Sequence, residues 1–370
     1  MTLPFVSLKN ELCMVFRDRL LALVLITVAC GGSNDGPLEP PSGPTRTFRM
    51  GFSAIPPRAN EAVLLAALDM WTQRGDAAIM HVSPPWAALL SGVSATAAVN
   101  ANELPLANYY RAKNLEVVVM VDATDGLNRA AEAPELVQLG RSISELSVQL
   151  AYRQFVMALS LIVKPTWLGL AAETNLIRKV APSPLYSSLV QMVNAAENDL
   201  RGIASATKRY VSVQVDVAWG RPLDNGAYQG VERDFADFPF MQALGLSSYP
   251  YFVFADPDEV PLDYYSRLPN GRPLSVMVVE GGWTSGTAGS IVSSPDKQAR
   301  YIRRQARMLD SARATALFQL TFTDLDVASL NLPPGSILPL FAQLGLVDTE
   351  LRPKPVLAVW DSLFAVRRSP

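Results

Sequence analysis

Short apolar runs that are rich in β-branched residues recur along the chain and are separated by more polar segments. Runs of this length and composition are typical of buried strands. The run Val117-Val118-Val119-Met120-Val121 is continuously apolar, as a parallel strand that is covered on both faces must be. The pattern predicts eight strands, over residues 48–54, 77–81, 116–122, 167–172, 211–217, 244–248, 275–279 and 316–322.

Segments of helical period lie between most of these runs. Two of them place apolar residues on one helical face, Leu64, Leu68 and Trp71 in the first and Ile302, Ala306 and Leu309 in the second. The Ser-Pro pairs at 183–184 and 294–295 each look like a helix N-cap followed by proline at the first helical position.

Strand and helix alternating eight times predict an α/β protein with a single (β/α)8 TIM barrel. A doubly wound open sheet uses the same alternation and is the alternative. That alternative favours a Gly-rich phosphate loop after the first strand, whereas Gly51-Phe52-Ser53-Ala54-Ile55-Pro56-Pro57 runs into proline.

The N-terminal segment has the layout of an export signal. A basic patch with Arg17 and Arg19 precedes an uncharged apolar run over residues 20–29, which ends at Cys30. The run is shorter than the roughly 20 apolar residues that a membrane-spanning helix needs, and it has the size of a signal-peptide core. Residues 1–29 are therefore predicted to be a signal peptide, whether translation starts at Met1 or Met14.

The residues Ile26-Thr27-Val28-Ala29-Cys30-Gly31 resemble the bacterial lipobox, although Thr27 stands where that motif usually has Leu. The resemblance implies that Cys30 is lipidated and becomes the mature N-terminus, which anchors the protein to a membrane of the bacterial cell envelope, outside the cytoplasm. The other cysteine, Cys13, lies in the removed segment, so Cys30 has no disulfide partner. The alternative is a cleaved signal followed by a soluble enzyme.

Residues 31–45 are rich in Gly, Pro and Ser and predict a disordered linker, and residues 46–370 have the composition of the folded barrel domain. The net charge of −2 without a basic cluster argues against a nucleic-acid partner, and we expect a monomer. A single histidine leaves too few ligands for zinc, so we expect neither a metal nor another cofactor. No Gly-x-Ser-x-Gly motif supports acyl transfer.

Active sites of such barrels form at the C-terminal ends of the strands, so the residues just past each run are the candidates for chemistry. They form an inventory of carboxylates and aromatic rings: Ser53, His81, Trp86, Asp122, Asp125, Glu173, Asn175, Asp216, Trp219, Tyr249, Tyr251, Glu280, Trp283, Asp324 and Asp326. Two glutamates, Glu173 and Glu280, follow the fourth and the seventh predicted strands. Glycosidases need two such carboxyl groups, one to protonate the leaving oxygen and one to attack or to activate water.

Three segments resemble a clan of retaining barrel glycosidases that includes endo-β-1,4-galactanases and β-1,3-glucanases. Val278-Val279-Glu280-Gly281-Gly282-Trp283-Thr284-Ser285 is similar to the nucleophile segment, often Glu-Thr-Gly-Trp-Pro-Ser, with Gly281 and Thr284 as departures. Gly169-Leu170-Ala171-Ala172-Glu173-Thr174-Asn175 resembles the acid/base segment. Ser247-Ser248-Tyr249-Pro250-Tyr251 is similar to the sixth strand, where a tyrosine supports the nucleophile.

The resemblance implies a glycoside hydrolase that acts on a carbohydrate, with Glu280 as the nucleophile and Glu173 as the acid/base, protonated at rest. A hydrogen bond from Tyr249 or Tyr251 is expected to keep Glu280 ionised. The clan has Asn where this chain has Ala172, and Asn175 is the candidate to replace it. The expected substrate-binding residues are Asn175, Tyr249, Tyr251, Trp283, His81, Trp86, Asp122 and Trp219.

The Ala172 departure also leaves open a second function, a glycan-binding surface lipoprotein that has lost turnover. The spacing of the two carboxyl groups discriminates between these functions. A separation of about 5 to 5.5 Å favours a retaining hydrolase. A wide separation, or an arginine between the carboxyl groups, favours binding alone.

The lipobox resemblance yields the first testable prediction. Cys30→Ser removes the thiol that would carry the lipid, so the variant should leave the membrane fraction or accumulate with its signal uncleaved. Fractionation of cells followed by immunoblotting measures this. Membrane attachment that is unchanged by the substitution would contradict the prediction.

Overall fold

The computed structural model describes residues 45–203, 206–221, 223–330, 332 and 335–369. The predicted signal peptide, Cys30 and the predicted linker up to residue 44 lie outside the described residues. The described chain begins beside its own end, because Arg46 N donates a hydrogen bond to Arg367 O.

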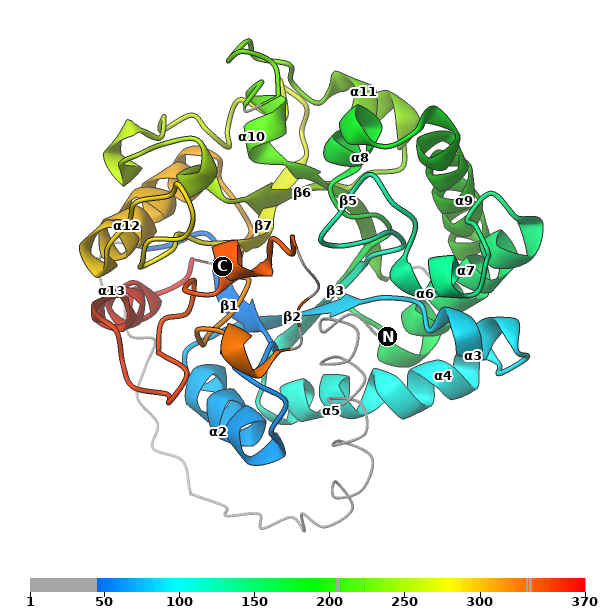
Figure 1. Cartoon of the computed structure of the whole chain (residues 1–370), viewed down its shortest axis with the longest axis horizontal. Helices are drawn as coiled ribbons and strands as arrows, with labels where there is room; N and C mark the ends of the chain where they lie inside the picture. The colour runs from blue at the N-terminus through cyan, green and yellow to red at the C-terminus, as the bar shows by residue number, and fades with distance from the viewer. Residues whose placement is uncertain (1–44, 204–205, 222, 331, 333–334, 370) are drawn as a thin grey trace, which may run out of the picture.

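Eight parallel strands form a closed barrel in the order of the sequence, and β1 pairs with β8 to close it (Figure 1). The strands are β1 (Arg49–Ser53), β2 (Ala77–Val82), β3 (Glu116–Val121), β4 (Trp167–Gly169), β5 (Lys208–Gln214), β6 (Ala243–Ser248), β7 (Ser275–Gly281) and β8 (Ala316–Gln319). All eight predicted strands are present, and the predicted single TIM barrel is confirmed.

Helices surround the barrel (Figure 1). The α-helices are α2 (Glu61–Thr72), α3 (Trp86–Leu90), α4 (Ala95–Asn102), α5 (Leu104–Ala112), α6 (Pro134–Gln138), α7 (Leu146–Ala158), α8 (Thr174–Val180), α9 (Ser183–Arg201), α10 (Val215–Ala218), α11 (Glu232–Asp237), α12 (Pro295–Ser311) and α13 (Pro355–Phe364). A π-helical turn, η1 (Leu159–Val163), continues α7, and short 3₁₀ turns are η2 (Pro250–Phe252), η3 (Pro257–Glu259), η4 (Val327–Ser329) and η5 (Leu338–Phe341).

Both predicted apolar helix faces are buried, on α2 and α12. Ser294 caps α12 as predicted, because its side chain accepts a hydrogen bond from Lys297 N. The prediction for Ser183 is wrong, since it is already the first residue of α9 and its N-cap is Pro182.

The first and third strands end one residue earlier than predicted, and three others end three residues earlier. The most informative case is the fifth, where residues 215–217 turn into α10 instead of continuing β5, because the side chain of Gln214 caps the helix by accepting from Val217 N. The fourth strand ends at Gly169 and the eighth at Gln319. These turns bring the residues that follow the strands over the barrel mouth.

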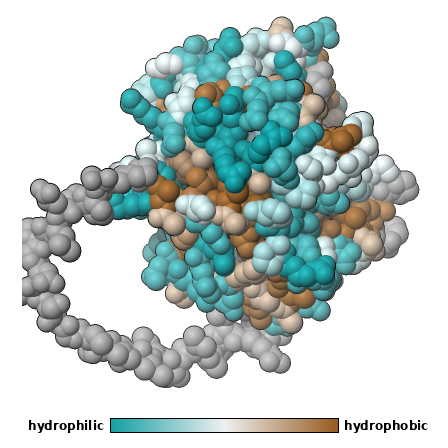
Figure 2. Space-filling view, turned by 90° about the vertical axis from the view of Figure 1, so that its left-hand side faces the viewer, coloured by the Kyte–Doolittle hydropathy of each residue, from teal (hydrophilic) through white to brown (hydrophobic). Residues whose placement is uncertain are grey.

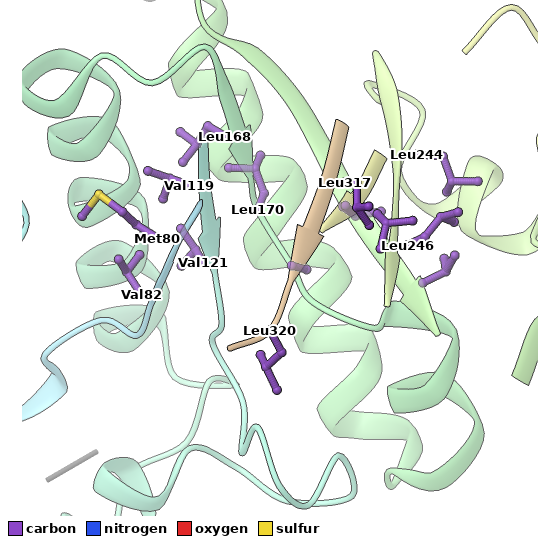
Figure 3. Packing of buried hydrophobic residues seen from close by; sticks show 14 of the residues in the cluster. Met80, Val82, Val119, Val121, Leu168, Leu170, Leu244, Leu246, Leu317 and Leu320 are labelled. Carbon is purple, nitrogen blue, oxygen red and sulfur yellow. The ribbon is translucent and has the colours of Figure 1, made fainter. Parts of the chain in front are cut away.

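Alternation along the strands separates two apolar layers. In β3, Val117, Val119 and Val121 belong to the layer between the strands and the helices, which Figure 3 shows for several strands. Val118 and Met120 point the opposite way and join the cluster that fills the barrel interior. The barrel is therefore a packed core, and only its mouth is available for a ligand.

The outer surface is mostly hydrophilic, with apolar side chains between polar ones, on the face that Figure 2 shows. Among the described residues, one helical stretch, Leu146–Val163, is long and apolar enough to cross a membrane. Slightly more than half of it, 56%, is buried in the protein, so it packs as a core helix of the barrel.

Close backbone packing at Gly51 in β1 generates the second prediction. A Cβ atom at this position would lie 1.9 Å from the carbonyl oxygen of Ala77, a backbone atom that cannot rotate away. Gly51→Ala should therefore destabilise the whole barrel in one cooperative transition, by roughly 1–3 kcal/mol.

Thermal unfolding followed by circular dichroism measures the effect of Gly51→Ala. Gly202→Ala is the matched control, because its nearest neighbour to an added Cβ is 3.8 Å away. Equal melting temperatures for the two variants, or a second transition from a separately unfolding half barrel, would contradict the packing argument.

Candidate active site

A cavity of about 960 Å³ opens at the C-terminal ends of the strands. Its walls come from the segments that follow β1 to β8, and they combine apolar and aromatic surface with a group of carboxylates. A cavity of this size accommodates a ligand of one to a few sugar rings. Both predicted catalytic glutamates line it.

A β-bulge in β7 directs Glu280 into the cavity. Leu246 of β6 pairs with Val278, but the next residue, Ser247, pairs with Glu280, so Val279 is an extra residue on β7. The extra residue turns Glu280 to the same side as Ser247, as bulges near active sites often do. Gly281 follows, and a Cβ there would lie 2.4 Å from the carbonyl oxygen of Ser248. The glycine that departs from the family pattern is thus required by the backbone.

Glu173 projects from the turn between β4 and α8. Its backbone is left-handed, with φ 48° and ψ 46°, a conformation that is costly for a residue with a side chain. The turn is held in place because Glu173 N donates a hydrogen bond to Ser212 Oγ at 3.0 Å. Such strain at a cavity wall is typical of functional sites.

The hydroxyl of Ser247 contacts both glutamates. Its Oγ lies 2.5 Å from Glu173 Oε1 and 2.7 Å from Glu280 Oε1. These contacts limit the separation of the two carboxyl oxygens to about 5 Å, which agrees with the spacing of retaining glycosidases. A hydroxyl has one proton and donates it to one acceptor only. A proton on the other carboxyl group would make the second short contact a hydrogen bond to the hydroxyl oxygen.

Arg129 forms a buried ion-pair network on the other side of Glu173. Its Nε donates to Glu173 Oε2 at 2.8 Å, and its Nη1 contacts both carboxylate oxygens of Asp122 at 2.8 Å. The guanidinium is 7% exposed, so the pair is poorly screened by solvent. Arg129 thus stabilises a negative charge on Glu173.

Glu280 lacks such a partner. Its pKa is raised to about 7, chiefly by burial and then by the nearby charge of Glu173, while Arg129 and Ser247 oppose the rise. The nearest nitrogen of His81 is 3.6 Å from Glu280 Oε2. Burial of Glu280 and the ion pair between Arg129 and Glu173 therefore favour a proton on Glu280, whereas the sequence predicts it on Glu173.

The predicted tyrosine donor to Glu280 is also corrected. Tyr251 donates to Leu340 O at 3.1 Å, and Tyr249 makes no hydrogen bond to another described residue. Burial, followed by the charges of Glu280 and Glu173, raises the pKa of Tyr249 well above its usual value. Ser247, two residues before Tyr249 at the end of β6, takes the place of the tyrosine beside Glu280.

Four of the predicted substrate-binding residues line the cavity, namely His81, Trp86, Asp122 and Tyr249. The indole Nε1 of Trp86 is buried without a hydrogen-bond partner among the described residues. Asp122 is already occupied by Arg129, which limits its availability to a sugar.

The other four lie outside the cavity lining. Asn175 uses its amide to bond both backbone groups of Gln214, at 2.8 Å each, so it does not replace the missing asparagine. Trp219 donates to Tyr264 O at 3.0 Å and stacks on the ring of Tyr264. Trp283 is 1% exposed and bonds to Ser293, and Tyr251 packs against Phe252. Their positions favour structural roles over sugar contact.

Sequence reasoning missed Arg129 and Ser247. Arg129 lies in the loop after β3, seven residues past Asp122, where no motif marks it. Ser247 stands inside a segment that the family resemblance identified, but the tyrosines next to it were favoured. The buried Asp216, from the original inventory, accepts from Tyr264 and from Gln214 Nε2, and burial raises its pKa to about 6.

Within the part of the chain that the structure describes, no group of three His, Cys, Asp or Glu side chains is arranged to hold a metal ion. The ionisable side chains that line the cavity are carboxyl groups, a histidine, a tyrosine and Arg129.

Comparison with solved structures identifies barrels of the same fold. A GH5_18 protein of Bifidobacterium longum subsp. longum in complex with Manβ1-4GlcNAc has a TM-score of 0.62 and 13% identity, over 87% of this chain and 80% of that chain. A GH53 catalytic domain of Ignisphaera aggregans has a TM-score of 0.60 and 16% identity, over 87% and 98%.

An exo-beta-1,4-mannosidase of Opitutaceae bacterium strain TAV5 has a TM-score of 0.61 and 15% identity, over 86% of this chain and 59% of that chain. The chain therefore spans less than two thirds of that enzyme. These likenesses show a shared barrel fold. No family model matches the chain, and no curated protein matches its sequence.

The position of the shared proton generates the third prediction. Because the pKa of folded Glu280 lies above its unfolded value, the unfolded state releases the proton first as the pH rises. The free energy of unfolding therefore falls between about pH 4.5 and pH 7. Glu280→Gln, which stays neutral, should be more stable than wild type at about pH 8, by roughly 2 kcal/mol, and closer to wild type near pH 5.

Chemical denaturation across this pH range measures the difference. Glu61→Gln, which removes an exposed carboxylate on α2, is the control for a change in net charge. A stability difference for Glu280→Gln that is constant with pH would mean that Glu280 is ionised throughout and that the shared proton lies elsewhere.

Proposed function

We propose that this protein is a glycoside hydrolase that cleaves a glycosidic bond in a polysaccharide or oligosaccharide by a retaining, two-carboxylate mechanism. The observation that carries the proposal is the pair of buried glutamates whose carboxyl oxygens lie within about 5 Å at the mouth of a sugar-sized cavity. Barrels of the same fold include a mannosidase and a protein with a bound disaccharide, which is consistent with this use of the fold.

Glu280 is the nucleophile in this proposal and Glu173 is the acid/base, as their positions on β7 and after β4 imply in the family that the sequence resembles. In the first step Glu173 protonates the leaving oxygen while Glu280 attacks the anomeric carbon, which gives a glycosyl ester on Glu280. In the second step Glu173 removes a proton from water, which hydrolyses the ester.

The charge of the cavity favours a neutral sugar over a uronic acid. Among the described residues that line it, Arg129 is the only arginine or lysine, and it is already paired with Asp122 and Glu173. Other carboxylates, such as Asp125 and Glu135, also line the walls. These groups accept hydrogen bonds from sugar hydroxyls and repel a substrate carboxylate.

A lipid anchor at Cys30 remains part of the proposal. It would hold the enzyme at the bacterial envelope, outside the cytoplasm, with the residues before 45 as a tether. Products would then form close to the cell surface. The N-terminal motif alone supports this placement.

A non-catalytic glycan-binding protein is the second candidate, and two observations favour it. Arg129 stabilises the charged form of the proposed acid, and Ala172 leaves no amide before Glu173 to bind a sugar hydroxyl. The short carboxyl spacing argues for the hydrolase, because a protein that only binds has no need of two carboxyl groups that share a proton.

The fourth prediction tests the two roles with the purified domain on aryl glycosides and polysaccharides. Glu280→Ala should abolish hydrolysis of every substrate, because no ester can form. Glu173→Ala should retain the first step on an aryl glycoside whose leaving group needs no proton, and azide should restore its turnover by replacing the missing base. Initial rates with and without azide measure both effects.

Glu61→Ala, on the exposed face of α2, is the control and should behave as wild type. Equal activity of wild type and both site variants on a confirmed substrate would refute the assignment. Binding of oligosaccharides without hydrolysis of any substrate would support the second candidate instead.

A further inference from the structure

The resting state of the site presents a problem for the proposed mechanism, and this inference rests on that function. The mechanism needs the proton on Glu173 and the charge on Glu280. The structure favours the reverse, because Arg129 pairs with Glu173 and no arginine or lysine contacts Glu280 among the described residues. A proton must therefore pass from Glu280 to Glu173 before the first chemical step.

We propose that Ser247 is the positioning residue that carries this proton, through a hydroxyl that contacts both carboxyl groups at once. Its Oγ lies within 2.7 Å of an oxygen of each glutamate, and its side chain is fully buried, so water does not compete for the contacts. The bulge in β7 is what places Glu280 opposite Ser247. Val278 faces the outer layer and Val279 the barrel interior, so without the bulge the regular alternation of the strand would turn Glu280 to the outer layer.

The proton transfer is balanced among Glu280, Ser247 and Glu173. The carboxyl proton of Glu280 moves to Ser247 Oγ as the hydroxyl proton of Ser247 moves to Glu173 Oε1. After the transfer, Ser247 is again a neutral hydroxyl that carries the proton from Glu280. Glu280 is a carboxylate, and Glu173 is a carboxylic acid. No proton is exchanged with solvent, and the net charge of the site is unchanged.

The reverse state, with Glu173 charged, is held by the ion pair with Arg129. A substrate that fills the cavity beside Arg129 weakens that pair and makes the transfer favourable. Substrate binding and proton transfer are therefore coupled in this scheme, and the free site stays in the inactive protonation state.

The other ionisable groups around the pair lie in other contacts. Arg129 and Asp122 face Glu173, His81 lies 3.6 Å from Glu280, and Asp216 is held by Tyr264 and Gln214. Tyr210 donates to Val119 O at 3.1 Å, and Tyr249 has no hydrogen bond to a described residue. Ser247 bonds to both glutamates.

The fifth prediction uses two variants of the same shape. Ser247→Thr keeps the hydroxyl, and Ser247→Val replaces it with a methyl group. Both side chains add the same bulk, and only the threonine can pass a proton. Ser247→Ala is a third variant in case the larger side chains do not fit. Ser248→Ala is the control, because Ser248 bonds to Tyr265 and touches neither glutamate.

A titration of the carboxyl carbons by NMR, in protein labelled with 13C-glutamate, tests the relay without any substrate. In wild type and Ser247→Thr, both carboxyl carbons should respond to the same pH step, because loss of the Glu280 proton changes the hydrogen bond that Glu173 accepts from the same hydroxyl. In Ser247→Val, the response of Glu173 should lose most of its amplitude, and Ser248→Ala should match wild type. Identical titrations of the Thr and Val variants would overturn the inference, even if the protein hydrolyses glycosides.

Kinetics then separate a relay from a merely structural role. On an aryl glycoside with a poor leaving group, Ser247→Val should lose about 100-fold in kcat relative to Ser247→Thr, the scale of general acid catalysis. With a dinitrophenyl leaving group above about pH 8, where Glu280 is ionised without help, the two variants should agree within a few fold. An equal loss on both substrates would show that Ser247 only shapes the site, and no hydrolysis by wild type would instead count against the proposed function.

Discussion

Two carboxyl groups that lie within about 5 Å of each other in a buried site cannot both be ionised without a large electrostatic cost. The surroundings of Glu173 and Glu280 follow from that constraint. Arg129 stabilises a charge on one member of the pair, burial favours a proton on the other, and Ser247 joins the two. The bulge in β7 and the left-handed turn at Glu173 are local departures from regular geometry that create this arrangement.

The barrel supports these departures because its remaining parts are regular. Eight paired strands leave no free edge, and two apolar layers hold the strands from inside and outside. Strain at one turn and an extra residue in one strand are therefore small against the stability of the whole fold. The cavity lies where the chain leaves the strands, so its side chains vary without disturbing the core.

Much of the fold follows from the sequence because burial imposes a repeated pattern. Runs such as Val117-Val118-Val119-Met120-Val121 identify strands that are covered on both faces, and the helical faces of α2 and α12 are equally clear. The end of β5 was predicted wrongly, because Val215 and Val217 have high strand propensity and the capping side chain of Gln214 prevails over it.

The candidate site was predicted in part. The two glutamates are found from their positions after strands, since the barrel brings all such ends together. Arg129 was not predicted, because an arginine in a loop belongs to no periodic pattern of the sequence. Its pairing depends on how that loop folds over the open end of the barrel. Ser247 was missed for a different reason, because a single extra residue in β7 decides which side chain of β6 faces Glu280. Sequence spacing does not report such a register shift.

In the proposed mechanism, Glu280 forms a covalent bond to a sugar at this site. Incubation with a 2-deoxy-2-fluoro glycoside that carries a good leaving group slows the second step and traps the intermediate, and peptide mapping by mass spectrometry then locates the label. We predict one sugar per chain on the peptide that contains Glu280, with loss of activity in proportion to labelling. Labelling of Glu173 or of another residue, or release of product with inverted anomeric configuration, would contradict it.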